Sequence, residues 1–289
     1  MPSLPELLEG VSRTFALSIP RLPEPLREEV VIAYLLMRIA DTFEDTSNAP
    51  FDARVEGIDA FCELMRRPES ESVMRRLQAA AARVQPDNEG ERAVLEHGAS
   101  IVAAFTQIRP AARDVIADTC HEMARGMRLW MHRVDADGFL RVRSLTELRE
   151  YCYVVAAIVG RMLTQLYLLE QPELAHLRYS LHERALAFGE GVQLVNILKD
   201  EADDALEKRA FLPPEVGREQ LFTLARRDLV SASEFVELLR DAGAPSGVVA
   251  FNQITLQLCT AALVVTEARG AGAKLQRGQV QDILAAAPR

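Results

Sequence analysis

A short group of carboxylates lies at the end of a very apolar part of the sequence. Asp41, Glu44 and Asp45 are spaced i, i+3 and i+4, so in a helix their side chains lie on one face. Residues 30–37, which precede them, are too apolar for a solvated surface. Like charges this close repel one another, and an acidic group in an apolar setting needs a compensating cation.

The same spacing occurs a second time, in Asp200, Asp203 and Asp204, after the apolar residues 192–198. Carboxylate oxygens with no His or Cys beside them suit Mg²⁺, which commonly links one or two carboxylates to the phosphates of a substrate. For either group alone, a solvated and acidic helix end is the simpler interpretation. Two such groups facing each other across a helical bundle would hold a diphosphate.

Basic residues near the two groups are candidates for binding phosphate oxygens. They are Arg13, Arg38, Lys199 and Arg209. The alternative for each is an ordinary salt bridge to a carboxylate three or four residues away.

Uncharged side chains near the acidic groups are further candidates. Gln193 and Asn196 lie on an apolar helix face, where an amide needs a hydrogen-bond partner. For the rings of Phe15, Tyr34 and Tyr151, the alternative to a functional role is packing in the core.

The composition predicts that helices position all of these residues. The 289 residues are 49% hydrophobic and 26% charged, a globular balance that excludes a disordered chain or a disulfide scaffold. Apolar periodicity and breaks at Pro and Gly predict one all-α domain over residues 1–289, without repeats or linkers. The expected helices cover residues 26–45, 51–66, 71–84, 89–108, 111–132, 144–170, 178–206, 215–227 and 246–269, with Ser144 and Ser231 at capping-box positions and a short terminal helix.

Several function classes find no support in the sequence. A net charge of −9 argues against a nucleic-acid partner. Residues 1–6 have neither the basic nor the apolar part of a secretory signal, so we expect a cytoplasmic protein. The apolar stretches 151–169 and 254–265 contain polar residues, and we expect core helices there rather than membrane spans.

The cysteines and histidines show no metal-site pattern. Cys62, Cys120, Cys152 and Cys259 are far apart without a CxxC pair, which predicts buried free thiols in a reducing compartment. The five His residues lack the spacing of a zinc site.

Taken together, five segments resemble the squalene/phytoene synthase family of head-to-head prenyl transferases. They are residues 12–16, 34–45, 151–160, 193–200 and 209–213. The resemblance implies a single helical bundle around a deep apolar cavity, with the two acidic helices facing each other at its mouth. It also implies that Mg²⁺ at these helices makes the diphosphate of a prenyl substrate a better leaving group.

The resemblance also implies roles for individual residues. Tyr151 would assist proton transfer or stabilise a carbocation, and the catalytic set would be completed by Asp41, Asp45, Asp200 and Asp204. The implied Mg²⁺ ligands are Asp41, Glu44, Asp45, Asp200 and Asp204. The implied substrate-binding residues are Ser12, Arg13, Phe15, Tyr34, Arg38, Gln193, Asn196, Lys199 and Arg209.

The reaction implied by the resemblance joins two farnesyl diphosphates through presqualene diphosphate. NADPH then reduces the final cation to squalene, or proton loss gives dehydrosqualene or phytoene. Lys274 and Arg277 lie in a late segment similar to the one associated with NADPH in squalene synthases, which favours the reductive branch. Gln276, Lys199 and Ala157 depart from the squalene synthase pattern, so the branch stays open.

Two other interpretations are weaker. A non-catalytic assembly factor of the same fold would have lost the acidic motifs, and both are intact. A terpene cyclase or chain-elongating synthase would not need residues 151–160 or 209–213. We expect a monomer without the C-terminal membrane anchor of eukaryotic squalene synthases, touching a membrane briefly to release its product. The length of the prenyl chain stays open.

Overall fold

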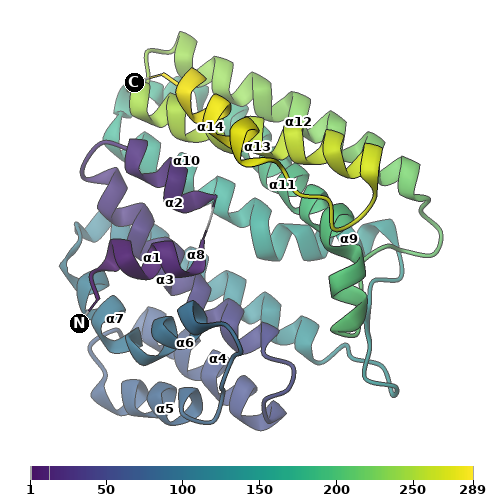
Figure 1. Cartoon of the computed structure of the whole chain (residues 1–289). Helices are drawn as coiled ribbons and strands as arrows, with labels where there is room; N and C mark the ends of the chain where they lie inside the picture. The colour runs from purple at the N-terminus through teal and green to yellow at the C-terminus, as the bar shows by residue number, and fades with distance from the viewer. Residues whose placement is uncertain (1, 13, 289) are drawn as a thin grey trace. The chain divides into compact units, whose positions relative to one another are not determined.

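The computed structural model describes residues 2–12 and 14–288. The chain divides into two compact units. The first contains the residues up to Ile19 together with Glu24–His132, and the second contains Pro20–Pro23 together with the chain from Arg133 onward. Helices dominate both units (Figure 1), so the all-α expectation is confirmed. The single domain stays a prediction.

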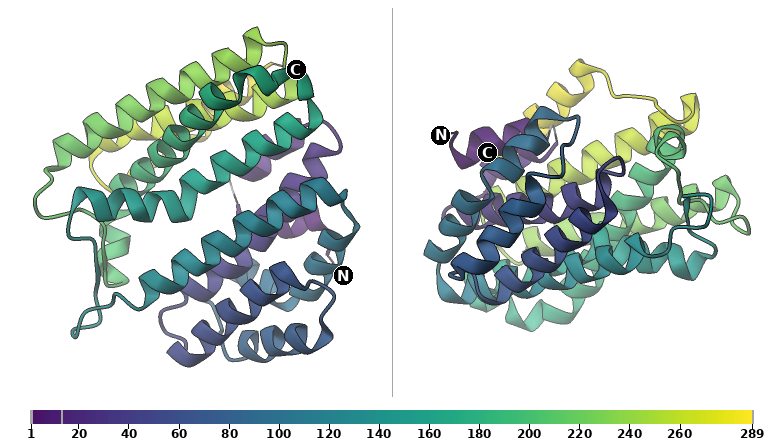
Figure 2. Two further views of the ribbon diagram at one scale, coloured as in Figure 1. Left: turned by 180° about the vertical axis from the view of Figure 1, so that it is seen from behind. Right: turned by 90° about the horizontal axis from the view of Figure 1, so that it is seen from below.

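The first unit is built around helix α3, which is buried on most of its circumference because residues 30–37 are almost all apolar. Helices α1, α4, α6, α7 and α8 pack against it, and the view from behind shows α8 running alongside (Figure 2). The helices of this unit are α1 (Leu4–Val11), α2 (Phe15–Ser18), α3 (Leu26–Asp45), α4 (Phe51–Arg66), α5 (Glu71–Ala81), α6 (Glu89–Glu96), α7 (Gly98–Gln107) and α8 (Pro110–Met131). The 3-10 turn η1 (Ile19–Arg21) lies where the chain passes between units.

The second unit is built around α11, which packs against α9, η2, α10, α12 and α13. Helices α12, α13 and α14 form successive neighbours on one side (Figure 1). The helical elements are α9 (Leu145–Cys152), the π-helical turn η2 (Tyr153–Ala157), α10 (Ile158–Glu170), the 3-10 helix η3 (Pro172–Leu177), α11 (Arg178–Leu206), α12 (Arg218–Asp241), α13 (Ser246–Arg269) and α14 (Arg277–Ala286).

Within the described residues, the strands are two short segments of the second unit. β1 (Leu140–Arg141) and β2 (Arg209–Ala210) pair in parallel, with Leu140 opposite Arg209. The N–H of Leu140 donates to the Lys208 carbonyl at 2.9 Å, and the N–H of Val142 donates to the Ala210 carbonyl at 2.9 Å. This pairing fixes the backbone on both sides of Arg209.

Several expected helices are confirmed at both ends: residues 26–45, 51–66, 178–206 and 246–269. Ser144 caps α9 as expected, its hydroxyl accepting the N–H of Glu147 at 3.2 Å. The Glu147 carboxylate accepts the N–H of Arg143 at 2.8 Å, one residue before the position that a capping box requires.

Three predicted helices differ from the structure. The predicted helix 71–84 ends at Ala81, because i→i−3 bonds from Arg83 and Val84 tighten the final turn. The predicted helix 89–108 is interrupted at His97, whose ψ of 11° leaves the helical region. The predicted helix 215–227 begins at Arg218 and runs to Asp241 as α12. Ser231 begins no helix, because the buried apolar residues of α12 recur every three or four positions on both sides of it.

A close helix crossing explains two glycines of the second unit. A Cβ at Gly189 of α11 would lie 2.4 Å from the Cα of Ala157, and one at Gly160 of α10 would lie 2.3 Å from the Ala185 carbonyl oxygen. The backbones therefore touch, so a side chain at either position would push η2 and α10 away from α11.

Two apolar segments of the second unit, Leu145–Glu170 and α13, are long and apolar enough to cross a membrane by length and composition. Their polar residues therefore do not exclude a span by these criteria, and the expected core helices stay a prediction. Within the unit, 39% and 56% of their most apolar windows are buried, as in helices that contribute to a core. The cysteines are free thiols as expected, with Cys62, Cys120 and Cys152 buried and Cys259 half-buried.

Candidate active site

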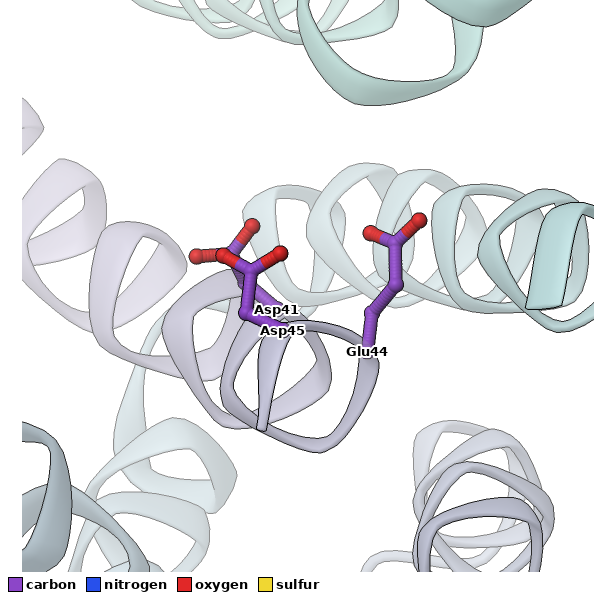
Figure 3. Close-up of side chains that lie close together, drawn as sticks. All are labelled: Asp41, Glu44 and Asp45. Carbon is purple, nitrogen blue, oxygen red and sulfur yellow. The ribbon is translucent and has the colours of Figure 1, made fainter. Parts of the chain in front are cut away.

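The carboxylates of the first acidic group come together at the C-terminal end of α3. One oxygen from each of Asp41, Glu44 and Asp45 lies within 4.8 Å of the others. Glu44 is buried, and the two aspartates are half-buried. Figure 3 shows the three side chains on the same side of the helix, with Asp41 beside Asp45. This arrangement has the oxygen donors and the negative charge that a divalent cation requires.

The position of this group in α3 makes it electrostatically unfavourable without a cation. The last turn of a helix carries partial negative charge from unsatisfied carbonyl groups, and α3 has no basic residue in that turn. Arg54 of α4 relieves part of the charge, since its Nε donates to the Phe43 carbonyl at 2.9 Å and a second nitrogen donates to the Glu44 carbonyl. Arg54 thus places a positive charge against two backbone carbonyls at the end of α3.

Arg38 links the acidic group to α6. One guanidinium nitrogen binds Asp41, and another binds Glu91 of α6 at 2.6 Å. Burial disfavours the charged guanidinium, but Asp41, Tyr34, Glu91 and Asp45 outweigh it and raise the pKa of Arg38 above its ordinary value. Its Nε is buried without a hydrogen-bond partner among the described residues. A buried N–H donor without a partner fits an incoming phosphate oxygen.

The other predicted residues of the first unit lie close to Arg38. Tyr34 precedes it by one helical turn, and its ring centroid lies 5.5 Å from that of Phe15. The Tyr34 hydroxyl donates to the Val11 carbonyl at 3.4 Å, and burial raises the pKa of Tyr34. Ser12 is buried and accepts the N–H of Phe15 at 2.9 Å. The structure therefore brings Ser12, Phe15, Tyr34 and Arg38 together, while Arg13 lies outside the described residues.

The second acidic group lies near the C-terminal end of α11. Gln193, Asn196, Lys199, Asp200 and Asp204 are half-buried, whereas the residues between Gln193 and Asn196 and between Asn196 and Lys199 are buried. This pattern places the five polar side chains along one side of α11.

A lysine neutralises part of this second group. The Lys199 ammonium lies 3.2 Å from the Asp200 carboxylate and donates to the Asn196 amide oxygen at 3.3 Å. Asp203 is exposed, and α11 has no basic residue in its last turn. Among the described residues, the close three-carboxylate cluster is the one on α3.

Tyr151 and the segment around β2 pack against each other in the second unit. The Tyr151 ring is buried and stacks on Phe211, with centroids 4.5 Å apart and planes 24° from parallel. Arg209, two residues before Phe211, pairs with Glu207 at 3.2 Å. Lys208 has a φ of 60°, which is uncommon for a residue with a side chain. The β1–β2 pairing and the Tyr151–Phe211 stack together position this segment.

The two residues expected to bind NADPH lie on the surface of the second unit. Lys274 is exposed in the connection between α13 and α14, and Arg277 is exposed as the first residue of α14. Two residues before Lys274, the N–H of Gly272 donates to the Lys199 carbonyl at 2.7 Å. This segment therefore touches α11 at the residue before Asp200.

Sequence reasoning missed four contributors to this geometry: Arg54, Glu91, Phe211 and Gly272. Phe211 lies in residues 209–213, one of the segments that resemble the squalene/phytoene synthase family, so its aromatic side chain could have been predicted as a site residue. Arg54 contacts carbonyls across the turn between α3 and α4. Glu91 and Gly272 contact residues far away in the chain, and for all three residues local spacing carried no signal.

Comparison with known proteins decides the family. The squalene/phytoene synthase profile matches residues 8–277, which is most of the chain. This protein belongs to the squalene/phytoene synthase family. Squalene synthase from Homo sapiens is 30% identical over 209 residues, covering 72% of this chain and 45% of its own. Squalene synthase from Schizosaccharomyces pombe is 28% identical over 214 residues, covering 73% and 44%. The chain thus spans less than half the length of these curated relatives.

Solved structures of the squalene/phytoene synthase family agree with the fold. A complex of TcSQS with a ligand is 26% identical to this chain, with a TM-score of 0.80, and the match covers 99% of this chain and 85% of that one. A dehydrosqualene synthase, 18% identical with a TM-score of 0.57, shares the fold. The resemblance seen in the sequence is confirmed at the level of family and fold.

Proposed function

We propose that this protein joins two farnesyl diphosphate molecules head to head through presqualene diphosphate and reduces the product to squalene, using Mg²⁺ and NADPH. The observation that carries the proposal is the three-carboxylate group on α3 with the buried, unpartnered Nε of Arg38 beside it. The chain also belongs to the squalene/phytoene synthase family, and the proteins similar to it include squalene synthases.

The acidic groups are proposed to hold Mg²⁺. Asp41, Glu44 and Asp45 would supply oxygen ligands to Mg²⁺, and so would Asp200 and Asp204. Mg²⁺ bound there would neutralise the diphosphate and make it a better leaving group. Each group lies near the C-terminal end of a helix, where the partial negative charge of the carbonyls adds to the attraction for a cation.

The basic residues are proposed to bind the diphosphate oxygens. Arg38 would use its free Nε and exchange a carboxylate contact for a phosphate oxygen. Lys199 would likewise turn from Asp200, and Arg209 from Glu207. Arg13 would add a fourth positive charge. Gln193 and Asn196 would line the path of the substrate along α11.

Aromatic side chains are proposed to surround the prenyl chains and the carbocation. The Phe15–Tyr34 pair supplies apolar surface next to Arg38 and Ser12. The Tyr151 ring, held by Phe211, offers a π face that stabilises positive charge and a hydroxyl for proton transfer. Apolar surroundings keep water from quenching the cation.

The final step is proposed to be reduction. NADPH would supply the hydride, and the exposed Lys274 and Arg277 would bind its phosphates. One observation favours the non-reductive alternative, with dehydrosqualene, phytoene or presqualene diphosphate as product. Gln276 caps α14: its side chain accepts the N–H of Gln279, and the Gln279 side chain accepts the N–H of Gln276 at 2.9 Å. The Gln276 side chain therefore caps a helix, at a position where the squalene synthase pattern has a basic residue.

We further propose that the protein works as a cytoplasmic monomer. Because squalene is a hydrocarbon, its release requires an apolar acceptor, and brief contact with a membrane surface would provide one.

The experiment incubates the purified protein with farnesyl diphosphate and Mg²⁺, with and without NADPH, and identifies the products by mass spectrometry. Squalene that forms only with NADPH supports the full proposal, and presqualene diphosphate or dehydrosqualene regardless of NADPH supports the alternative. Asp41→Asn and Asp200→Asn should each remove all products. Asp241→Asn, at the exposed end of α12, is the matched control and should retain activity. Full activity in the first two variants would overturn the metal assignment.

A further inference from the structure

Two glycines give the chain its sharp turn after α13. Gly270 has a φ of 90° and Gly272 a φ of 79°, values that favour glycine. A Cβ at either position would meet no atom within 4 Å. The backbone conformation, and not a lack of space, therefore calls for glycine here. The turn begins the C-terminal segment, which we define as residues 270–287.

The turn is tied to the second acidic group by one hydrogen bond. The N–H of Gly272 donates to the Lys199 carbonyl at 2.7 Å. Lys199 also pairs with Asp200 through its side chain, so a single residue contacts both the C-terminal segment and a proposed Mg²⁺ ligand.

The far end of the C-terminal segment is held by apolar packing. Ala250, Ile254 and Leu258 of α13 form a buried cluster with Ala287. The side chains packed against this cluster come from the C-terminal segment: Leu275, Val280, Ile283 and Leu284. Arg21 donates to the Leu284 carbonyl at 3.2 Å. Figure 1 shows α14 lying over α13. Residues 273 and 274 are thus fixed between two anchors.

We propose that Gly272 is a positioning residue whose bond to the Lys199 carbonyl holds Lys274 beside the acidic end of α11. Lys274 is two residues further on, so its Cα lies at most about 7 Å from that of Gly272. The exposed ammonium of Lys274 then adds positive charge at the edge of the second acidic group, where an anionic phosphate of NADPH would otherwise be repelled by Asp200, Asp203 and Asp204. The part of this inference that concerns NADPH rests on the proposed function.

The structure supplies a matched control. Gly243, in the turn between α12 and α13, has a φ of 78° and the same empty space around its Cβ position. Its N–H donates to the Arg240 carbonyl at 3.0 Å, within the local turn. Gly243→Ala and Gly272→Ala therefore both place a side chain at a positive φ of nearly the same value, but only the second disturbs the contact with α11.

The first measurement is amide hydrogen exchange on the full chain. The rate of amide exchange across residues 271–276 should rise roughly tenfold in Gly272→Ala. This is the effect of losing one hydrogen bond whose net contribution to stability lies near the upper end of the usual range. Exchange in the same residues should stay at the wild-type rate in Gly243→Ala. Equal rates in both variants would overturn the positioning contact.

The second measurement separates positioning from general destabilisation. In Gly272→Ala the KM for NADPH should rise about tenfold while the KM for farnesyl diphosphate stays within about twofold, since the lost contact has the strength of one hydrogen bond. Lys274→Ala should have the same effect, and the double variant should be no worse than Lys274→Ala alone. Equal increases in both KM values, or additive effects, would overturn the inference. If the wild type makes no NADPH-dependent product, the proposed reduction fails, whereas the exchange comparison still decides the contact.

Discussion

Arg38 and Glu91 form an ion pair of 2.6 Å that joins α3 to α6 directly beside the carboxylate group of α3. Both side chains are about one-quarter exposed or less. The pair holds the guanidinium in place without a substrate, but it also competes with any phosphate for the same positive charge.

Removing that competitor should strengthen phosphate binding. Glu91→Gln should tighten the binding of pyrophosphate in the presence of Mg²⁺ by a few-fold and should lower the free energy of unfolding by about 1 kcal/mol. Isothermal titration and urea unfolding measure the two effects. Glu63→Gln, which removes an exposed pair with Arg76 on α4 and α5, is the control and should leave pyrophosphate binding unchanged. Weaker pyrophosphate binding in Glu91→Gln would mean that Glu91 orients Arg38 for the phosphate rather than competing with the phosphate for it.

Cation binding at the end of α3 should stabilise the folded protein. Mg²⁺ at a hundred times its dissociation constant should raise the free energy of unfolding by about 2.7 kcal/mol, because it binds the folded chain alone. Asp45→Asn should remove most of this gain by deleting one of the three carboxylates. Asp114→Asn, exposed on α8, should keep it. Thermal unfolding with and without Mg²⁺ tests this, and an equal gain in both variants would place the ion elsewhere.

An ion pair between a buried Glu29 and a half-buried Arg109 fixes the start of α8 to α3. Arg109 binds Glu29 through two contacts, of 2.6 Å and 3.1 Å, and Glu29 is 1% exposed. Glu29→Ala should lower the free energy of unfolding by roughly 3–5 kcal/mol, because it leaves a charge partly buried without its main partner. Combining Glu29→Leu with Arg109→Met should recover much of the loss. Urea unfolding measures both, and a single-variant loss below about 1 kcal/mol would contradict this account.

Two carboxyl groups near α9, Glu190 of α11 and Asp228 of α12, should make the free energy of unfolding depend on pH. Burial raises the pKa of Asp228 and, together with the charge of Asp228, the pKa of Glu190. The groups around them are Arg149 and Cys152 of α9 and Arg227 of α12, whose guanidinium binds one Asp228 oxygen at 2.8 Å. The other oxygen of Asp228 has no hydrogen-bond partner among the described residues.

The sign follows from the direction of the shift. A carboxyl with a raised pKa in the folded state stabilises the fold at low pH, and this contribution is lost as the pH rises from its ordinary value of about 4 through the raised one. Asp228→Asn should therefore gain stability relative to the wild type across that range, as measured by unfolding at a series of pH values. Asp137→Asn is the opposite control: Arg141 lowers the pKa of Asp137 to about 2, so the wild-type advantage at this position should fade as the pH drops toward 2. A pH-independent difference for Asp228→Asn would contradict the assignment.

Local rules predicted most of the helices because their signals act within one or two turns. Pro25 and Pro50 lie just before two helices whose ends were predicted to the residue. The same rules failed at Ser231, where a capping pattern lies inside α12. There the burial of Asp228, Leu229 and Ala232 continues one packed stripe through the pattern, and tertiary packing outweighs a local capping preference.

The sequence by itself determined which side chains share a helix face. Spacing of i, i+3 and i+4 places Asp41, Glu44 and Asp45 together whatever surrounds α3, because the helical repeat is fixed by backbone geometry. Only the tertiary structure decided the partners of these residues: Glu91 on Arg38, Phe211 on Tyr151, and Gly272 on the Lys199 carbonyl. Such contacts join segments far apart in the chain, and they depend on how helices pack rather than on any local repeat.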